Sequence, residues 1–161
     1  FNIGGDKMKD TFEKALQFVL KWEGGYSNNP NDPGGLTIFG ISQRSYPKEV
    51  AKMNELWKQG KKQEALNIAK EIYRKNYWDK IKGDDLPFPL DFVAFDTAVN
   101  MGVGACQQLL SQANGDWKQL LFLRLLRYIR LATVNTKLAI FLQGWANRVA
   151  ALNETIRKEV K

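Results

Sequence analysis

Apolar residues recur along most of the chain at the three- and four-residue spacing of one helix face. This spacing predicts helices over roughly 11–23, 48–58, 61–77, 89–101, 103–113, 117–132 and 136–159. The first carries Phe12, Leu16 and Val19 on one side, opens at a capping Asp10 and closes before Gly24. The fold class is therefore expected to be mostly α, a helical bundle.

Residues 24–36 follow the first predicted helix and are dense in Gly, Asn, Pro and Asp. Such a density of turn formers predicts a surface loop without regular structure. Leu36, Thr37, Ile38 and Phe39 then alternate in polarity before Gly40. This alternation indicates one short strand or β-hairpin after the first helix, and the β content is expected to stop there.

The predicted helix 89–101 is apolar nearly all round, which places it in the middle of the bundle. Its polar residues Asp96 and Asn100 lie four apart on one face and need partners if buried. We expect Asp96 to be structural and to tie a neighbouring loop. Farther along, Arg124, Arg127 and Arg130 recur every three residues. They could form a basic strip for phosphate or cell wall, but a solvated helix face is the favoured interpretation.

The chain has 161 residues, 44% of them hydrophobic, which suits one domain with a single core. We expect this domain over residues 8–161, with residues 1–7 as a disordered or non-native leader. No histidine is present, which excludes Ser-His-Asp and Cys-His catalysis and histidine-bound metals. No metal or cofactor is expected. Cys106 has no second cysteine to pair with and is expected to be a packing residue.

The formal charge of +7 attracts polyanions, whether nucleic acid, anionic lipid headgroups or bacterial wall polymers, and does not choose among them. The apolar runs are too short and too charged to span a bilayer. Because the chain has no histidine, acid–base chemistry is expected to depend on carboxylates.

Glu23 is the leading catalytic candidate, because it ends the first helix on its apolar face, directly before Gly24 and Gly25. Burial raises the pKa of a carboxyl group toward the range of a general acid, although a frayed, solvated glutamate would give the same pattern. Asp32 is the nearest second carboxylate in the loop. Glycoside hydrolysis uses such a pair, and the Thr37 hydroxyl could hold the attacking water.

The run from Glu23 to Ile41, EGGYSNNPNDPGGLTIFGI, resembles the signature of glycoside hydrolase family 108, bacterial and phage N-acetylmuramidases. Motifs IYRKNYWD, FDTAVNMG and GWANRV follow in the family's order, so the resemblance covers nearly the whole chain from Met8. It implies a lysozyme-like fold, a predicted peptidoglycan-binding region from about residue 90, and Glu23 as catalytic acid. Phage lysozymes are more loosely similar, with one residue more between the positions of Asp32 and Thr37.

The resemblance implies a muramidase that cleaves the β-1,4 bond between N-acetylmuramic acid and N-acetylglucosamine in peptidoglycan. Glu23 would protonate the leaving oxygen, and Asp32 or a water on Thr37 would complete the reaction. The residues expected to line the glycan cleft are Tyr26, Tyr77, Trp78 and Asn100, with a core position for Trp78 equally open. Alternatives are a lytic transglycosylase, or a non-catalytic module that binds cell wall or nucleic acid.

We expect a monomer that is made in the cytoplasm and acts on glycan strands of the bacterial cell wall, in the periplasm or outside the cell. No nucleic-acid partner is expected. Without an export signal, a holin or a secretion route would have to release it. The sequence leaves open whether it is a phage or prophage endolysin or a bacterial secretion-associated hydrolase.

Overall fold

The computed structural model describes residues 4–160, with side chains from residue 11 onward. The chain forms two compact units, which are described separately. The smaller unit is Leu16–Asn76, and the larger unit combines Phe1–Ala15 with Tyr77–Lys161. One domain over residues 8–161 stays a prediction. Residues 1–3 of the predicted leader lie outside the described residues, whereas residues 4–7 belong to the first helix.

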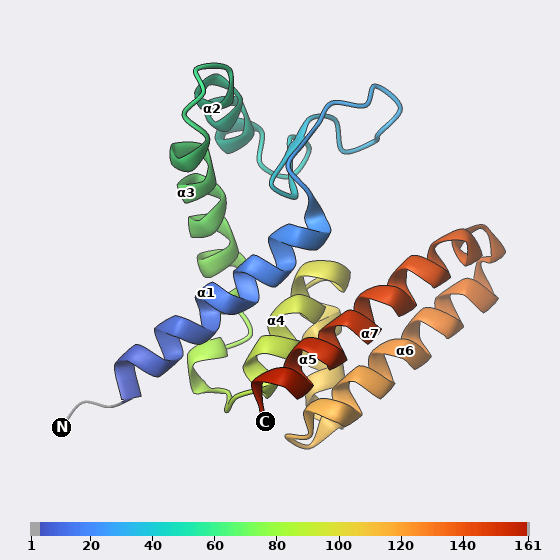
Figure 1. Cartoon of the computed structure of the whole chain (residues 1–161). Helices are drawn as coiled ribbons and strands as arrows, with labels where there is room; N and C mark the ends of the chain where they lie inside the picture. Colours follow the sequence, from blue (N-terminus) through green and yellow to red (C-terminus); the bar gives the residue numbers. More distant parts are fainter. Residues whose placement is uncertain (1–3, 161) are drawn as a thin grey trace. The chain divides into compact units, whose positions relative to one another are not determined.

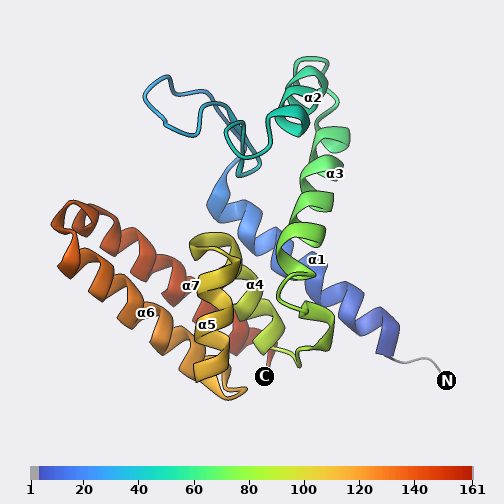
Figure 2. The ribbon, with the colours of Figure 1, turned by 180° about the vertical axis from the view of Figure 1, so that it is seen from behind.

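Helices dominate both units, which confirms the mostly α prediction (Figure 1, with the reverse view in Figure 2). The first helix, α1, spans Gly4–Glu23 and runs through both units. The smaller unit continues with strands β1 (Tyr26–Ser27), β2 (Thr37–Ile38) and β3 (Ile41–Ser42) and helices α2 (Pro47–Lys58) and α3 (Lys62–Tyr73). A π-helical turn, η1, covers Arg74–Trp78 at the junction. The larger unit holds η2 (Gly83–Asp85), α4 (Leu90–Met101), α5 (Val103–Ala113), α6 (Trp117–Val134), η3 (Thr136–Phe141) and α7 (Leu142–Glu159).

Several bounds differ from the sequence prediction, including the start of the first helix and the extent of the β structure. The first helix begins at Gly4 and not at Asp10, because the preceding Lys-Met-Lys run favours helix and contains no breaker. Tyr26–Ser27, in the segment predicted to lack regular structure, pair with Ile38 and Thr37 to form β1. The β structure is thus an antiparallel sheet in the order β1-β2-β3. Long-range pairing overrides local turn propensity here.

The larger unit is organised around a buried ion network on α4. Asp96 is fully buried and accepts hydrogen bonds from Arg124 of α6 at 2.7 Å and from Arg148 of α7 at 2.7 Å. Arg124 also donates to the Tyr128 hydroxyl at 2.8 Å, and that hydroxyl donates to Asn100. Asp96 therefore joins three helices, which corrects the prediction that it ties a loop.

The two arginines also correct the sequence interpretation. Periodicity assigned Arg124 to a solvated face, but the side chains of both Arg124 and Arg148 are buried. A guanidinium enters a core only with a partner that offsets its lost hydration, and Asp96 supplies that partner. Cys106 is buried as expected, and its thiol donates to the Ala94 carbonyl at 3.2 Å. Burial raises the pKa of this thiol to about 12.

Replacement of the shared carboxylate should strongly destabilise the protein. Asp96→Ala leaves two buried guanidiniums without an anion, and we expect a loss of about 3–5 kcal/mol of unfolding free energy, measured by urea titration. The matched control, Glu154→Gln, breaks the exposed pair with Lys158 at 2.9 Å and should leave the midpoint unchanged. Equal midpoints for wild type and Asp96→Ala would contradict a structural role for the network.

A second buried carboxylate generates a pH dependence. The pKa of Asp91 is raised from 3.8 to about 6, mainly by burial and to a smaller extent by nearby Asp84, against a hydrogen bond of 2.7 Å from the Phe92 N–H that lowers it. The folded state therefore binds this proton more tightly than the unfolded state. The stability contributed by Asp91 falls as the pH rises from about 4 to about 6, and is constant above that.

Asp91→Asn should remove this dependence. The unfolding free energy of the variant, minus that of wild type, should grow by about 2 kcal/mol between pH 4 and pH 7, because each pKa unit corresponds to about 1.4 kcal/mol and part of the change lies below pH 4. Urea unfolding of both proteins at several pH values measures the difference, and the other carboxylates cancel. A difference that does not change with pH would contradict the raised pKa.

Candidate active site

Glu23 is the last residue of α1 and is half-buried. The helix ends there because Gly24 adopts a left-handed backbone, φ 81°, while its N–H still donates to the Leu20 carbonyl at 3.1 Å. The carboxylate thus stands at a fixed helix end, directly beside the small sheet.

The backbone of the β2–β3 turn lies in close contact with the Glu23 side chain. Phe39 and Gly40 join the strands as a two-residue loop with φ of 51° and 80°, the geometry of a type I′ turn. A Cβ on Gly40 would lie 2.6 Å from the Cβ of Glu23 and would also collide with the Tyr73 hydroxyl. Only glycine fits this position, for reasons of both space and backbone angle.

Two hydrogen bonds hold the turn in place. The buried Tyr73 donates its hydroxyl proton to the Phe39 carbonyl at 2.7 Å, and the Phe39 N–H donates to the Gly25 carbonyl at 2.7 Å. The first bond links the turn to α3, and the second links it to the chain just after Glu23. The stem of Glu23 is therefore enclosed by α1, the turn and Tyr73.

Thr37 lies in the central strand, with Ser27 opposite it in β1 and Ser42 opposite it in β3. Residues directly opposite in antiparallel strands face the same side of a sheet. The register therefore places three hydroxyl groups in a row on one face, while Ile38 and Ile41 are buried. Such a row can hold a water molecule by hydrogen bonds.

Asp32 lies in the long loop between β1 and β2 (Figure 1) and is exposed. Its Oδ1 accepts the Gly34 N–H at 2.8 Å, so the carboxylate shapes the loop as an Asx turn. No hydrogen bond joins Asp32 to Glu23 among the residues described. The structure places both carboxylates in the smaller unit and leaves Oδ2 of Asp32 without a recorded partner.

Tyr26 belongs to an aromatic cluster that the sequence interpretation did not identify. Its ring lies 5.4 Å from that of Trp57 at 30°, and its hydroxyl donates to Asn54 at 3.2 Å. Trp57 also contacts Phe39 edge-on, with centroids 5.4 Å apart. The amphipathic spacing of residues 48–58 could have indicated Trp57, but nothing local to it indicates the turn that it supports.

The remaining predicted site residues, Tyr77, Trp78 and Asn100, belong to the larger unit. Trp78 is fully buried, contacts the rings of Phe12 and Phe95, and donates its indole N–H to Asp84 at 2.9 Å. Its ring has no exposed face for a sugar, so we correct its assignment from glycan binding to the core. Tyr77 and Asn100 are half-buried, and glycan contact by these two residues stays a prediction.

Among the side chains that the structure describes, residues 11–160, no cluster of three or more Asp, Glu or Cys is arranged to hold a metal ion. None of the helices described is both long and apolar enough to cross a membrane.

Comparison with known proteins decides the class of chemistry. The sequence profile of glycosyl hydrolase 108 matches residues 16–102, more than half of the chain and the whole segment from Glu23 to Asn100. The chain belongs to glycosyl hydrolase family 108. It is also similar to the structure of Brucella abortus SagA, with 28% sequence identity, a TM-score of 0.69, and coverage of 93% of this chain and 95% of that one. No curated protein matches the chain.

This family 108 protein is therefore a glycoside hydrolase with a lysozyme-like α fold, and family membership supports peptidoglycan as its substrate class. The resemblance and the fold class predicted from the sequence are both confirmed.

The close approach of Gly40 generates a test of the site. Gly40→Ala adds a methyl group where Glu23 and Tyr73 already stand, so the turn must shift and the carboxylate with it. We expect kcat to fall roughly 100-fold, because a misplacement of about 1 Å in an active site has that effect. Turnover of purified peptidoglycan is the measurement.

Gly60→Ala is the matched control. Gly60 has nearly the same backbone angle, φ 76°, but a Cβ there has nothing within 4 Å. Both variants therefore carry the same backbone strain, and only Gly40→Ala carries the collision. Equal losses of activity in the two variants would show that strain, and not the position of Glu23, is responsible.

Proposed function

We propose that this protein is an N-acetylmuramidase that hydrolyses the β-1,4 bond between N-acetylmuramic acid and N-acetylglucosamine, with Glu23 as general acid. The observation that carries the proposal is the half-buried carboxylate at the end of α1, enclosed by the Gly40 turn and Tyr73, in a glycoside hydrolase. A carboxyl group held in a fixed position at the end of a helix can be placed within reach of the glycosidic oxygen to which it donates a proton.

In the proposed reaction, Glu23 donates its proton to the leaving oxygen as the bond to the anomeric carbon breaks. The positive charge that develops on the sugar ring is quenched by a water molecule, whose own proton passes to a carboxylate. Two arrangements can activate this water. In the first, the hydroxyl row of Thr37, Ser27 and Ser42 holds the water while its proton passes to a carboxylate. In the second, the second carboxylate oxygen of Asp32 binds the water directly and accepts its proton.

Tyr26 is the proposed stacking platform for the glycan in the smaller unit. It is 39% exposed, yet its ring is braced by Trp57 and its hydroxyl is held by Asn54. A rigid, partly exposed aromatic ring suits contact with the apolar face of a sugar, since little side-chain freedom is lost on binding.

Glu23→Gln tests the assignment directly. Glutamine keeps the size of the side chain but cannot act as an acid, so we expect turnover of purified peptidoglycan to fall by about 100-fold or more with the melting temperature unchanged. Glu55→Gln, an exposed glutamate on α2 of the same unit, is the control and should retain full activity.

The mass of the products separates the reaction classes. Hydrolysis leaves a reducing-end muramic acid, whereas a lytic transglycosylase leaves an anhydro ring that is lighter by one water. Anhydro products from the wild type would replace the hydrolase proposal with the transglycosylase. Unchanged turnover by Glu23→Gln would remove Glu23 from the mechanism.

A further inference from the structure

The carboxyl-terminal helical hairpin has an unusual charge pattern. Residues 117–153 contain no Asp or Glu, although the whole chain has 17. Two of the six basic residues in this stretch, Arg124 and Arg148, are buried against Asp96. Of the other four, Lys118 lies at the start of the stretch, and Arg127, Arg130 and Lys137 lie near the connection between the two helices. None of these last three has an acidic partner among the residues described.

The same hairpin exposes large apolar side chains at one end. Helices α6 and α7 lie side by side in opposite directions, with η3 connecting them at the tip (Figures 1 and 2). Around this connection Val134 is 89% exposed, Ile140 79% and Phe141 49%. We name residues 127–141 the hairpin tip. Isolated exposed apolar residues are ordinary on a protein surface, but several gathered at one end of a hairpin indicate a contact site.

Aromatic contacts between α6 and α7 support the hairpin tip. Tyr128 of α6 stacks on Trp145 of α7, with ring centroids 4.7 Å apart, and Trp145 also contacts Phe141 at 5.9 Å. The apolar side chains are therefore presented on a braced pair of helices and do not belong to a frayed end.

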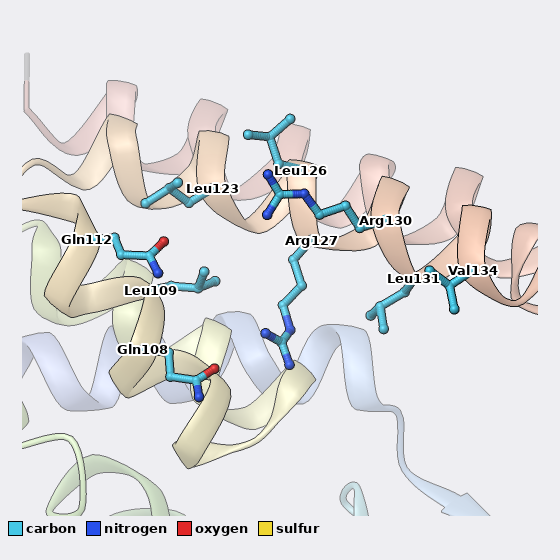
Figure 3. A pocket seen from close by; sticks show the side chains of 9 residues that line it. All are labelled: Gln108, Leu109, Gln112, Leu123, Leu126, Arg127, Arg130, Leu131 and Val134. Carbon is cyan, nitrogen blue, oxygen red and sulfur yellow. The ribbon is translucent and has the colours of Figure 1, made fainter.

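A groove of about 300 Å³ runs along the α5 side of α6 and is continuous with the hairpin tip (Figure 3). It is lined by four leucines, two glutamines, Val134, Arg127 and Arg130, and by no acidic residue. Figure 3 shows the Arg127 side chain extending from α6 toward α5, with Leu131 and Val134 farther along α6. Aliphatic walls beside two guanidiniums suit a molecule with a hydrocarbon part and an anionic head.

We propose that the hairpin tip binds the surface of a membrane that contains anionic phospholipid. Val134, Ile140 and Phe141 enter the boundary between headgroups and acyl chains, while Arg127, Arg130 and Lys137 meet the headgroup phosphates. This arrangement of apolar and basic side chains is the one by which proteins lie on anionic bilayers without spanning them.

Other occupants fit the hairpin tip less well. A second copy of the chain would place the same cations against one another, since no acidic residue on the hairpin tip could pair with them. Nucleic acid or an anionic wall polymer would satisfy the cations but would leave Val134 and Ile140 in water. Of these occupants, an anionic lipid surface is the one that uses both sets of side chains. The proposal does not depend on the hydrolase assignment.

Vesicle flotation tests the proposal with the full chain. We expect binding to vesicles of phosphatidylglycerol and phosphatidylethanolamine, and none to pure phosphatidylcholine. The triple change Arg127→Gln, Arg130→Gln and Lys137→Gln should weaken binding about fivefold per cation removed, since each is worth about 1 kcal/mol near an anionic surface. Val134→Ser with Ile140→Ser should also weaken binding, and should do so even at low salt.

Matched controls come from the other end of α6. Phe122 is 54% exposed and lies twelve residues before Val134, about 18 Å along the helix axis. Phe122→Ser and Lys118→Gln change an exposed apolar and a basic residue outside the hairpin tip, and should leave vesicle binding unchanged. Circular dichroism melting establishes that each variant is folded.

Three results would overturn the proposal. Equal losses in tip and control variants would show that binding is not local to the hairpin tip. Binding that is insensitive to Val134→Ser with Ile140→Ser, and equal for vesicles and soluble polyanions, would assign the cations to a wall polymer or nucleic acid. A dimer in light scattering that the same double change converts to monomer would make the hairpin tip an interface between copies of this chain.

Discussion

The approach of the Gly40 backbone to Glu23 is the constraint on which the candidate active site depends. A three-stranded sheet of two-residue strands is too small to be stable by itself. It persists because its turn is tied to Tyr73 on one side and to Gly25 on the other. The sheet in turn prevents the end of α1 from fraying. Removal of the Gly40 contact would therefore release both the sheet and the carboxylate.

In the larger unit, the corresponding constraint is on the orientation of α4, a helix that is apolar on nearly every side. Such a helix can rotate among similar hydrophobic environments at little cost, so packing alone specifies its orientation weakly. Asp96 removes this freedom, because only one orientation of α4 presents the carboxylate to Arg124 and Arg148 together. The network is not fully satisfied, since Nη2 of Arg124 has no hydrogen-bond partner among the residues described. Its value therefore lies more in specifying the packing than in added stability.

Hydrophobic spacing was sufficient to predict most of the helices, because each buries a continuous stripe whose period is local to the sequence. It failed where the deciding partner is distant. The sequence around Arg124 and Arg148 does not indicate that both form ion pairs with an aspartate on another helix. The sequence around Tyr26 likewise does not indicate that it pairs with Ile38 in a sheet. The position of Glu23 was predictable because a helix end and two glycines are adjacent in sequence. Tyr73, which holds the Gly40 turn, and Trp57, which contacts Phe39 in that turn, come from separate helices and were missed.

The contrast between local and long-range determinants also bears on which residue would hold the attacking water in the proposed reaction. Asp32 lies in an exposed loop, and one of its carboxylate oxygens is already engaged by the Gly34 N–H. Thr37 is held by pairing on both sides, and a shift of one residue in that register would turn Ile38 out of the core. Its hydroxyl is therefore fixed by the same burial that stabilises the sheet, whereas the position of Asp32 depends on loop geometry alone. These considerations favour, for the proposed reaction, a water held by Thr37, with the second carboxylate oxygen of Asp32 as the candidate proton acceptor.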